Sequence, residues 1–244
     1  MDLSSRKTGA FFVIDGTDGS GKATQTKRLV ERLRLEGYNV ETISFPQYGA
    51  KSCGSVERYL AGDYGRSTEV NARAASIFYA VDRFDASFQI RAWLDAGKIV
   101  VSDRYVGSNM AHQGQKIHDT TERHAYLAWN DDLEHNIFGI PRPTLNLVLS
   151  VPLDVAIQLA AQGATEKTKV AGDIHEADRN HIRSSINTYK EITRLFPSFH
   201  HVNCAPHGTL RSIDDIHEEL WQAVLPHIGT PVTSFTQHQE TISV

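Results

Sequence analysis

The sequence of 244 residues has few cysteines, a small net charge and no long hydrophobic run. Cys53 and Cys204 are its only cysteines and lack the spacing of metal ligands, which argues against a disulfide scaffold and for a reduced, cytoplasmic chain. No apolar segment reaches the ~18 residues of a membrane span, and residues 1–9 lack the apolar core of a signal peptide. The formal net charge of -4 gives no general attraction for nucleic acid or an anionic membrane. We therefore expect neither as a partner, and a site for an anion has to be built locally.

The pattern that is present is typical of an α/β protein. Short apolar runs alternate with longer helical patterns, which predicts βαβ units around a five-stranded parallel sheet. One domain is expected over 1–228, with a polar stretch at about 162–176 that is either a lid or a surface loop, and a flexible tail over 229–244. Strands are expected at 10–15, 39–45, 98–103, 145–151 and 199–203, and helices at 22–36, 70–96, 121–138, 153–162, 176–195 and 213–225.

The most informative segment is Gly16–Thr24, with the sequence G-T-D-G-S-G-K-A-T, which follows a strand pattern and opens a helical pattern. That order is the one a phosphate-binding P-loop needs, because backbone N–H groups and the helix N-terminus then converge on phosphate oxygens. Lys22 adds a mobile positive charge. Ala23 stands where a Ser or Thr normally supplies a hydroxyl for Mg²⁺. The alternative is a glycine-rich turn that only caps a helix.

A second candidate site follows the strand pattern at 98–103. An acid at the carboxyl end of a strand is where an α/β sheet places a Mg²⁺-organising aspartate, so Asp103 is expected to hold a metal-bound water. Arg104 would face phosphate. The alternative for this pair is an ordinary surface salt bridge.

Two polar pairs could recognise a base. Tyr79 and Arg83 are four residues apart on one helix face, and so are Asn109 and Gln113 if that segment is helical. A ring could stack on a base, while guanidinium and amide groups could bond its edge. The alternative for Tyr79 is core packing, and the alternative for Asn109 and Gln113 is a polar helix start. The aromatic residues around Pro46 could also pack a base, or Phe45 could belong to the core at the end of its strand.

Taken together, these segments resemble the thymidylate kinases of the P-loop nucleoside monophosphate kinase group. The resemblance spans roughly 11–225 and implies the three-layer α/β/α P-loop NTPase fold, with ATP and Mg²⁺ as cofactors, dTMP as acceptor and a homodimer. The segments that carry it are 14–25, Phe45-Pro-Gln-Tyr-Gly49, Tyr79-Ala-Val-Asp-Arg83, Ser102-Asp-Arg-Tyr-Val-Gly-Ser-Asn109, Gly139-Ile-Pro-Arg-Pro143 and Asp173-Ile-His-Glu176.

The resemblance implies roles on the phosphate side of the site. Asp18 would bind the deoxyribose 3′-hydroxyl and help order a water on Mg²⁺, and Arg104 would contact the acceptor and transferring phosphates. Metal would be held by Asp103 through water, with Thr24 as a weaker candidate. The implied ATP-binding residues are Gly16, Gly19, Ser20, Gly21, Lys22, Ala23 and Thr24, with Cys204 and Ala205 bordering the adenine.

It also implies roles around the acceptor nucleoside. Tyr79 would stack on thymine, Arg83 would bond its carbonyl edge and Asn109 would bond the base further. The remaining implied substrate residues are Phe45, Tyr48, His112, Gln113, His175 and Glu176.

Four departures from the family pattern bear on these roles. Ala23 lacks the hydroxyl that normally binds Mg²⁺, so we expect the metal to be held through water. Gln47 stands at or beside the position where many members carry an Arg that meets the acceptor phosphate. His112 replaces a Tyr or Phe that often screens the 2′ side of the sugar. The P-loop also carries no Arg, so we expect the lid to supply the catalytic charge, with Lys169 first and Arg179 second; a solvated charged loop is the alternative.

The predicted activity is phosphoryl transfer from ATP to dTMP, with Asp18, Lys22, Arg104 and Lys169 as catalytic residues. A kinase for another deoxynucleotide or nucleoside is the second interpretation, motivated by Gln47 and His112. A nucleotide-binding regulator that has lost catalysis is the third. The helix predicted over 70–96 has more apolar residues than one face needs, which is compatible with a dimer interface or with full burial.

Overall fold

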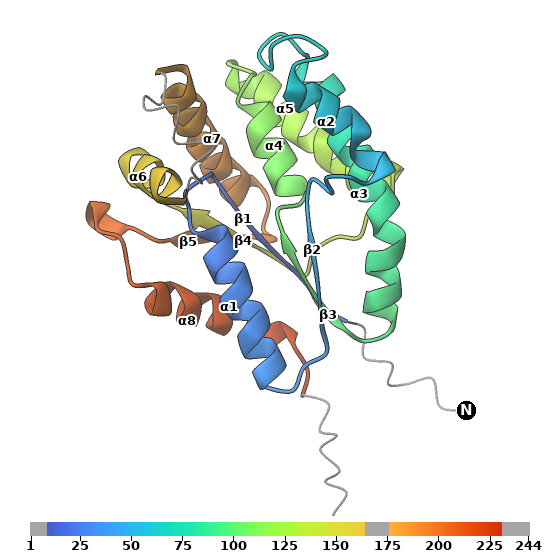
Figure 1. The fold of residues 1–244 in the computed structure, drawn as a ribbon, viewed down its shortest axis with the longest axis vertical. Helices are drawn as coiled ribbons and strands as arrows, with labels where there is room; N and C mark the ends of the chain where they lie inside the picture. Colours follow the sequence, from blue (N-terminus) through green and yellow to red (C-terminus); the bar gives the residue numbers. More distant parts are fainter. Residues whose placement is uncertain (1–8, 164–175, 231–244) are drawn as a thin grey trace, which may run out of the picture.

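In the computed structural model, the part of the chain that is described comprises residues 9–163 and 176–230. Its centre is a five-stranded, all-parallel sheet with the order β2-β3-β1-β4-β5. The strands are β1 (Phe11–Gly16), β2 (Val40–Ser44), β3 (Ile99–Asp103), β4 (Leu145–Ser150) and β5 (Phe199–Asn203). β1 is the middle strand, and its carboxyl end leads directly into the glycine-rich loop (Figure 1).

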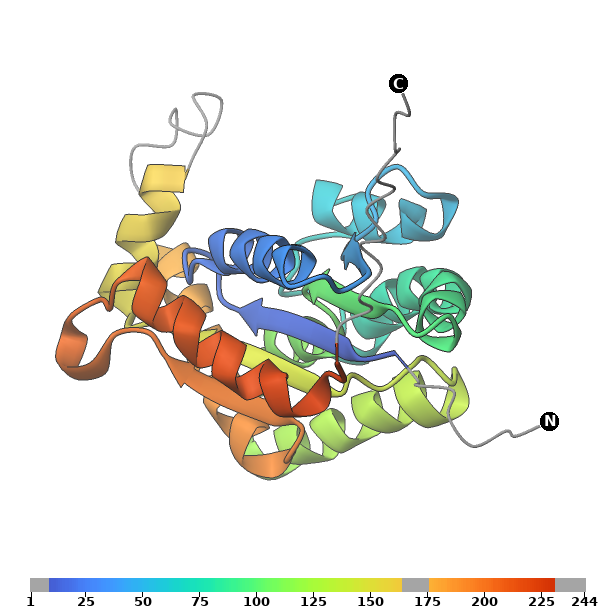
Figure 2. The same ribbon diagram turned by 90° about the horizontal axis from the view of Figure 1, so that it is seen from below.

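Helices cover both faces of the sheet, which gives the three layers (Figures 1 and 2). On one face, α1 (Lys22–Leu35) packs beside α8 (Ile213–Val224). On the other face lie α3 (Ala72–Asp95), α4 (Val106–Gly114), α5 (Thr120–Asp131) and α7 (Glu176–Leu195). The further elements are α2 (Gly54–Ala61), α6 (Leu153–Gly163), the short helices η1 (Lys51–Cys53), η3 (Pro206–Gly208) and η4 (Leu225–His227), and the π-helical turn η2 (Asp132–Ile137).

Two apolar clusters hold these layers together, because the side chains of each strand alternate between the two faces. Phe12 and Ile14 of β1 point into the cluster under α1 and α8, with Leu33 and Trp221. Phe11 and Val13 point into the cluster under α3, α4, α5 and α7. The central strand is thus buried on both faces, and its carboxyl end is a rigid base for the loop that follows.

The α/β fold with five parallel strands is confirmed, and each observed strand lies within one residue of its predicted bounds. The helix predicted over 121–138 is α5 continued by η2, whose wider π turn the periodicity did not indicate. The short helix α2 was not predicted. Among the described residues, no helix is both long enough and apolar enough to cross a membrane. The predicted lid at 162–176 and the tail at 229–244 fall mostly outside the described residues.

Candidate active site

The loop between β1 and α1 has the backbone of a phosphate-binding loop. Gly16 has a φ of 143°, and a Cβ added there would lie 2.5 Å from the carbonyl oxygen of Leu149. Gly19 and Gly21 also have positive φ, which lets the loop turn sharply into α1. Only glycine fits at Gly16. The loop ends at the N-terminus of α1, where an anion is favoured.

Lys22 is buried beside this loop. Its Nζ donates a hydrogen bond of 2.7 Å to the carbonyl oxygen of Thr17 and lies 4.0 Å from Oδ1 of Asp18. Burial, with the nearby positive charge of Arg104, lowers the pKa of Lys22 to about 8. The ammonium group is therefore easily deprotonated in the free protein, and a polyphosphate beside it would stabilise the charged form.

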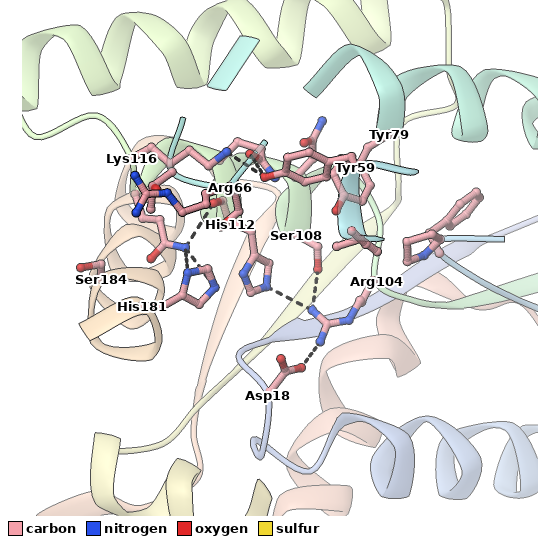
Figure 3. A pocket seen from close by; sticks show the side chains of 18 of the residues that line it. Asp18, Tyr59, Arg66, Tyr79, Arg104, Ser108, His112, Lys116, His181 and Ser184 are labelled. Carbon is pink, nitrogen blue, oxygen red and sulfur yellow. Dashed lines mark hydrogen bonds and ion pairs between the residues drawn. The ribbon is translucent and has the colours of Figure 1, made fainter. Parts of the chain in front are cut away.

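Arg104 is the centre of the polar network on the other side of the loop (Figure 3). It pairs with the Asp18 carboxylate, and its Nη1 contacts Oγ of Ser108 and Nε2 of His112, each at 3.3 Å. Its backbone adopts a left-handed φ of 67°, uncommon for a residue with a Cβ. Desolvation alone would raise the pKa of Asp18, but the positive charges of Arg104 and Lys22 outweigh it and lower this pKa.

His112 acts here as an uncharged acceptor. Burial and the adjacent Arg104 lower the pKa of His112 to about 3, so its ring is neutral at physiological pH. Since guanidinium can only donate, Nε2 accepts from Arg104, and Nδ1 carries the proton toward Oγ of Ser185 at 3.4 Å. His112 therefore helps to orient Arg104, a role that the sequence did not indicate.

A cavity of about 930 Å³ opens from Asp18 and Arg104 and extends between α2, α3, α4 and α7 (Figure 3). Its size is within the range of ligand pockets. The predicted base-binding residues meet in it although they come from two helices: Tyr79, Arg83, Asn109 and Gln113 all line its wall. Tyr79 packs edge-on against Tyr59, with ring centroids 6.2 Å apart, so the cavity has an aromatic wall.

The segment after β2 forms another part of this wall. Phe45 and Tyr48 both line the cavity, but Phe45 is buried against Tyr105, while the Tyr48 ring is exposed at the rim. The buried carboxylate of Asp82 in α3 holds this segment. It accepts a hydrogen bond of 2.9 Å from the Gln47 N–H and one of 3.1 Å from the Ser52 hydroxyl. Nothing in the local sequence indicates this role of Asp82.

Arg83 has a partner that the sequence did not reveal. Its guanidinium forms a two-point ion pair with Glu134 of η2, with Nε–Oε2 at 2.5 Å and Nη2–Oε1 at 2.7 Å. Asn109 donates to the same carboxylate at 2.9 Å. The contact of Arg83 with a thymine carbonyl stays a prediction. The edge of its guanidinium formed by Nε and Nη2 is already bonded to Glu134.

The residues expected to organise a metal lie at the carboxyl ends of β1 and β3. Oδ1 of Asp103 and Oγ of Ser20 are buried and have no hydrogen-bond partner in the part of the chain that the structure describes. Burial raises the pKa of Asp15, whose Oδ1 accepts a hydrogen bond of 2.5 Å from the Ser108 hydroxyl. Its Oδ2 has no hydrogen-bond partner within 9–163 and 176–230. Three or more His, Cys, Asp or Glu side chains do not gather in a metal-binding group anywhere in the described chain. The oxygen atoms of Asp103, Ser20 and Asp15 suit Mg²⁺, because this ion needs only one or two protein carboxylates and takes its other ligands from water and phosphate oxygens.

The other predicted residues have varied positions. Thr24 is exposed on α1, and Cys204 and Ala205 are buried just after β5, outside the cavity. Burial raises the pKa of the Cys204 thiol to about 11. Glu176 is the first residue of α7, and Arg179 lies 3.2 Å from Asp154 of α6. Lys169 and His175 lie outside the described residues.

Comparison with known proteins agrees with this geometry. A sequence model of the thymidylate kinase family matches residues 14–202. The thymidylate kinase of Mycobacterium tuberculosis is 28% identical over 182 residues, which cover 74% of this chain and 84% of that protein. A probable thymidylate kinase of Thermococcus onnurineus is 31% identical over 216 residues, covering 86% of this chain and 94% of that protein.

A solved structure of the thymidylate kinase of Candida albicans has the same fold, with a TM-score of 0.68 at 22% identity, covering 90% of this chain and 92% of that one. The family match includes the P-loop lysine, the Asp103-Arg104 segment and the four predicted base-binding residues. The resemblance seen in the sequence is therefore confirmed, and the chain belongs to the thymidylate kinase family.

Proposed function

We propose that this chain transfers the γ-phosphoryl group of ATP to the phosphate of dTMP, forming dTDP and ADP, at the junction of the P-loop and the 930 Å³ cavity. The observation that carries the proposal is the position of Arg104, which lies beside Asp18 of the P-loop and also lines the cavity. A nucleotide phosphate in the cavity and a triphosphate on the loop would meet at this guanidinium.

Phosphoryl transfer needs alignment and neutralisation of charge more than covalent help. Lys22 and the loop amides would hold the ATP phosphates, and Arg104 would bridge donor and acceptor. When the substrates bind, the ion pair between Asp18 and Arg104 would be partly given up, and Asp18 would bind the deoxyribose 3′-hydroxyl. The acceptor is already an anion, so no strong general base is required.

A bound Mg²⁺ would neutralise charge on the ATP phosphates. Asp103 would hold it through water from the carboxyl end of β3, since its Oδ1 is buried without a partner. Ser20 is a second oxygen donor with the same property and lies within the P-loop itself. Thr24, which is exposed on α1, fits less well than either.

The P-loop carries no Arg to neutralise the transferring phosphate. Our first candidate for this positive charge is still Lys169, and the second is Arg179. The contact of Arg179 with Asp154 is between exposed side chains and would be readily exchanged for a phosphate. We also retain the expectation of one kinase domain over 1–228 in a cytoplasmic chain; both cysteines are buried free thiols, as in a reducing compartment.

The test is an ADP-release assay over a panel of acceptors: dTMP, dUMP, dCMP and dGMP, with thymidine as the nucleoside control. We expect dTMP to have the highest kcat/KM. A preference for thymidine over dTMP would overturn the monophosphate kinase assignment. ATP binding without turnover of any acceptor would favour a regulator.

A wider acceptor range is the second candidate. The printed title of the Candida albicans structure ascribes broad substrate specificity to that enzyme. In this chain His112 lines the cavity and contacts Arg104 at 3.3 Å, at a position where the family resemblance implies a Tyr or Phe. Comparable kcat/KM values for dTMP and dGMP in the same panel would support the wider range.

A further inference from the structure

One fully buried ion pair lies behind the cavity wall. Arg83 and Glu134 have side-chain exposures of 2% and 0%, and they are joined by two hydrogen bonds of 2.5 and 2.7 Å. Taking two charges out of water is costly, so such a pair needs a reason beyond stability. Its position offers one, because Arg83 is also a lining residue of the cavity.

Glu134 also determines how the amide of Asn109 is oriented. The Nδ2 atom of Asn109 lies 2.9 Å from Oε1 of Glu134 and 3.1 Å from the carbonyl oxygen of Ser76. A carboxylate and a carbonyl can only accept, so the nitrogen of the amide has to face them. The Oδ1 atom is then on the other side, where it is buried and has no hydrogen-bond partner among the described residues.

The same carboxylate therefore fixes the polarity of two neighbouring groups on the cavity wall. Arg83 can only donate, and Glu134 occupies one edge of its guanidinium, which leaves the other N–H groups for a ligand. Asn109 is left with an acceptor, and a buried acceptor without a partner calls for a donor. A ligand that satisfies both presents an N–H beside a carbonyl oxygen.

We propose that Glu134 is a positioning residue that sets this donor–acceptor pattern and thereby selects a pyrimidine imide, as in thymine or uracil, against cytosine. The inference rests on the proposed function, since it places the acceptor base between Arg83 and Asn109. The imide N3–H would donate to Oδ1 of Asn109, and the adjacent carbonyl would accept from Arg83. In cytosine N3 is an acceptor and C4 carries an amino group in place of the carbonyl, so both contacts would be mismatched when the C4 side faces Arg83.

Two substitutions separate polarity from shape. Glu134→Gln keeps the size of the side chain but places an NH₂ against donors, whereas Glu134→Asp keeps the acceptor charge and loses a methylene. We expect Glu134→Gln to lower the ratio of kcat/KM for dTMP to that for dCMP by at least about tenfold. We expect Glu134→Asp to retain more of that ratio. If Glu134 only fills space, the order of the two variants is reversed.

Glu191→Gln is the matched control. Glu191 forms a comparable two-point ion pair with Arg123, at 2.8 and 2.7 Å, between α7 and α5 and away from the cavity lining. It should leave the dTMP to dCMP ratio unchanged whatever it does to thermal stability. An unchanged ratio in Glu134→Gln would overturn the proposal.

The unmodified enzyme gives an independent measurement in case Glu134→Gln does not fold. The 3-methyl derivative of dTMP has no donor at N3, so its kcat/KM should fall at least about 100-fold below that of dTMP. Turnover of this analogue at the rate of dTMP would overturn the inference. Absence of dTMP turnover in the unmodified enzyme would instead overturn the proposed function.

Discussion

At the scale of single residues, Lys22 is the cation most directly placed for ATP. Removing a cation aimed at the transferring phosphate typically costs on the order of 10³-fold in rate or more. We therefore expect Lys22→Ala to lose at least about 10³-fold in kcat with dTMP while its circular dichroism spectrum stays that of the parent. Lys27→Ala is the control, because Lys27 is exposed on the same helix, with its Nζ 3.8 Å from Oε1 of Glu31. Near-normal turnover by Lys22→Ala would refute the mechanism.

The lowered pKa of Lys22 gives a pH dependence whose sign can be worked out. In the free protein this pKa is about 8, below the ordinary value, and phosphates require the protonated form. ATP binding should then take up a proton as the pH rises through 8, and affinity should fall by up to about tenfold per pH unit above it. Calorimetry at pH 7.5 and 9, in buffers of different ionisation enthalpy, measures this uptake. Equal uptake at both pH values would contradict it, and Lys22→Ala should show none.

The same shift affects the folded state. A lysine whose pKa is lowered by folding is protonated in both states below pH 8, so it contributes no slope there. Between about pH 8 and its ordinary value, the unfolded chain binds more protons, and the contribution of Lys22 to unfolding free energy rises with pH. This is opposite in sign to the effect on ATP affinity.

At the scale of elements, Asp82 of α3 holds the segment that follows β2. In Asp82→Ala the Gln47 N–H and the Ser52 hydroxyl lose a buried acceptor, which should cost about 1–3 kcal/mol of stability. Because Pro46 and Tyr48 line the cavity, we expect KM for dTMP to rise by roughly tenfold with a smaller change in kcat. Steady-state kinetics and urea unfolding check both parts. Asp85→Ala, exposed on the same helix, should change neither; parent-like kinetics in Asp82→Ala would show that the segment holds itself in place.

The elements also explain what the sequence could and could not predict. β1 and its loop were predictable because an apolar run, glycines and a lysine stand next to each other in the chain. Tyr79, Arg83 and Asn109 could be named as candidates from local spacing and family resemblance. Glu134 could not, since it lies 51 residues from Arg83 and 25 from Asn109, and nothing local distinguishes it from a surface acid. A wider π turn carries it inward, and such turns are frequent at functional sites.

At the scale of the whole molecule, one apolar face of α3 is exposed and is not covered by any of the residues that the structure describes. Ile77, Val81, Phe84 and Phe88 are between 40% and 61% exposed, although they are large and apolar. A stripe of this kind on a helix is typical of an interaction surface. We infer that it is the contact between two copies of the chain, which agrees with the homodimer expected from the sequence.

A charge in this stripe should separate the copies. Phe88 is 61% exposed and packs edge-on against Phe84, so Phe88→Glu should lose little folding stability. We expect light scattering after size-exclusion chromatography to give about twice the chain mass for the parent and the chain mass for Phe88→Glu. Leu35→Glu, at the far end of α1, tests whether any exposed apolar residue would do the same. A monomeric parent would refute the assignment of this face.

The left-handed backbone of Arg104 has a consequence for how such a chain can evolve. A side chain with a Cβ in this region costs about 1–2 kcal/mol relative to right-handed backbone, and glycine would avoid the cost. As far as this backbone cost goes, selection for thermal stability alone would favour glycine in place of Arg104, which pairs with Asp18 of the loop and lines the cavity. Continued selection for turnover would keep arginine at this position despite the backbone cost, so we expect a descendant that no longer needs the activity to lose Arg104 early.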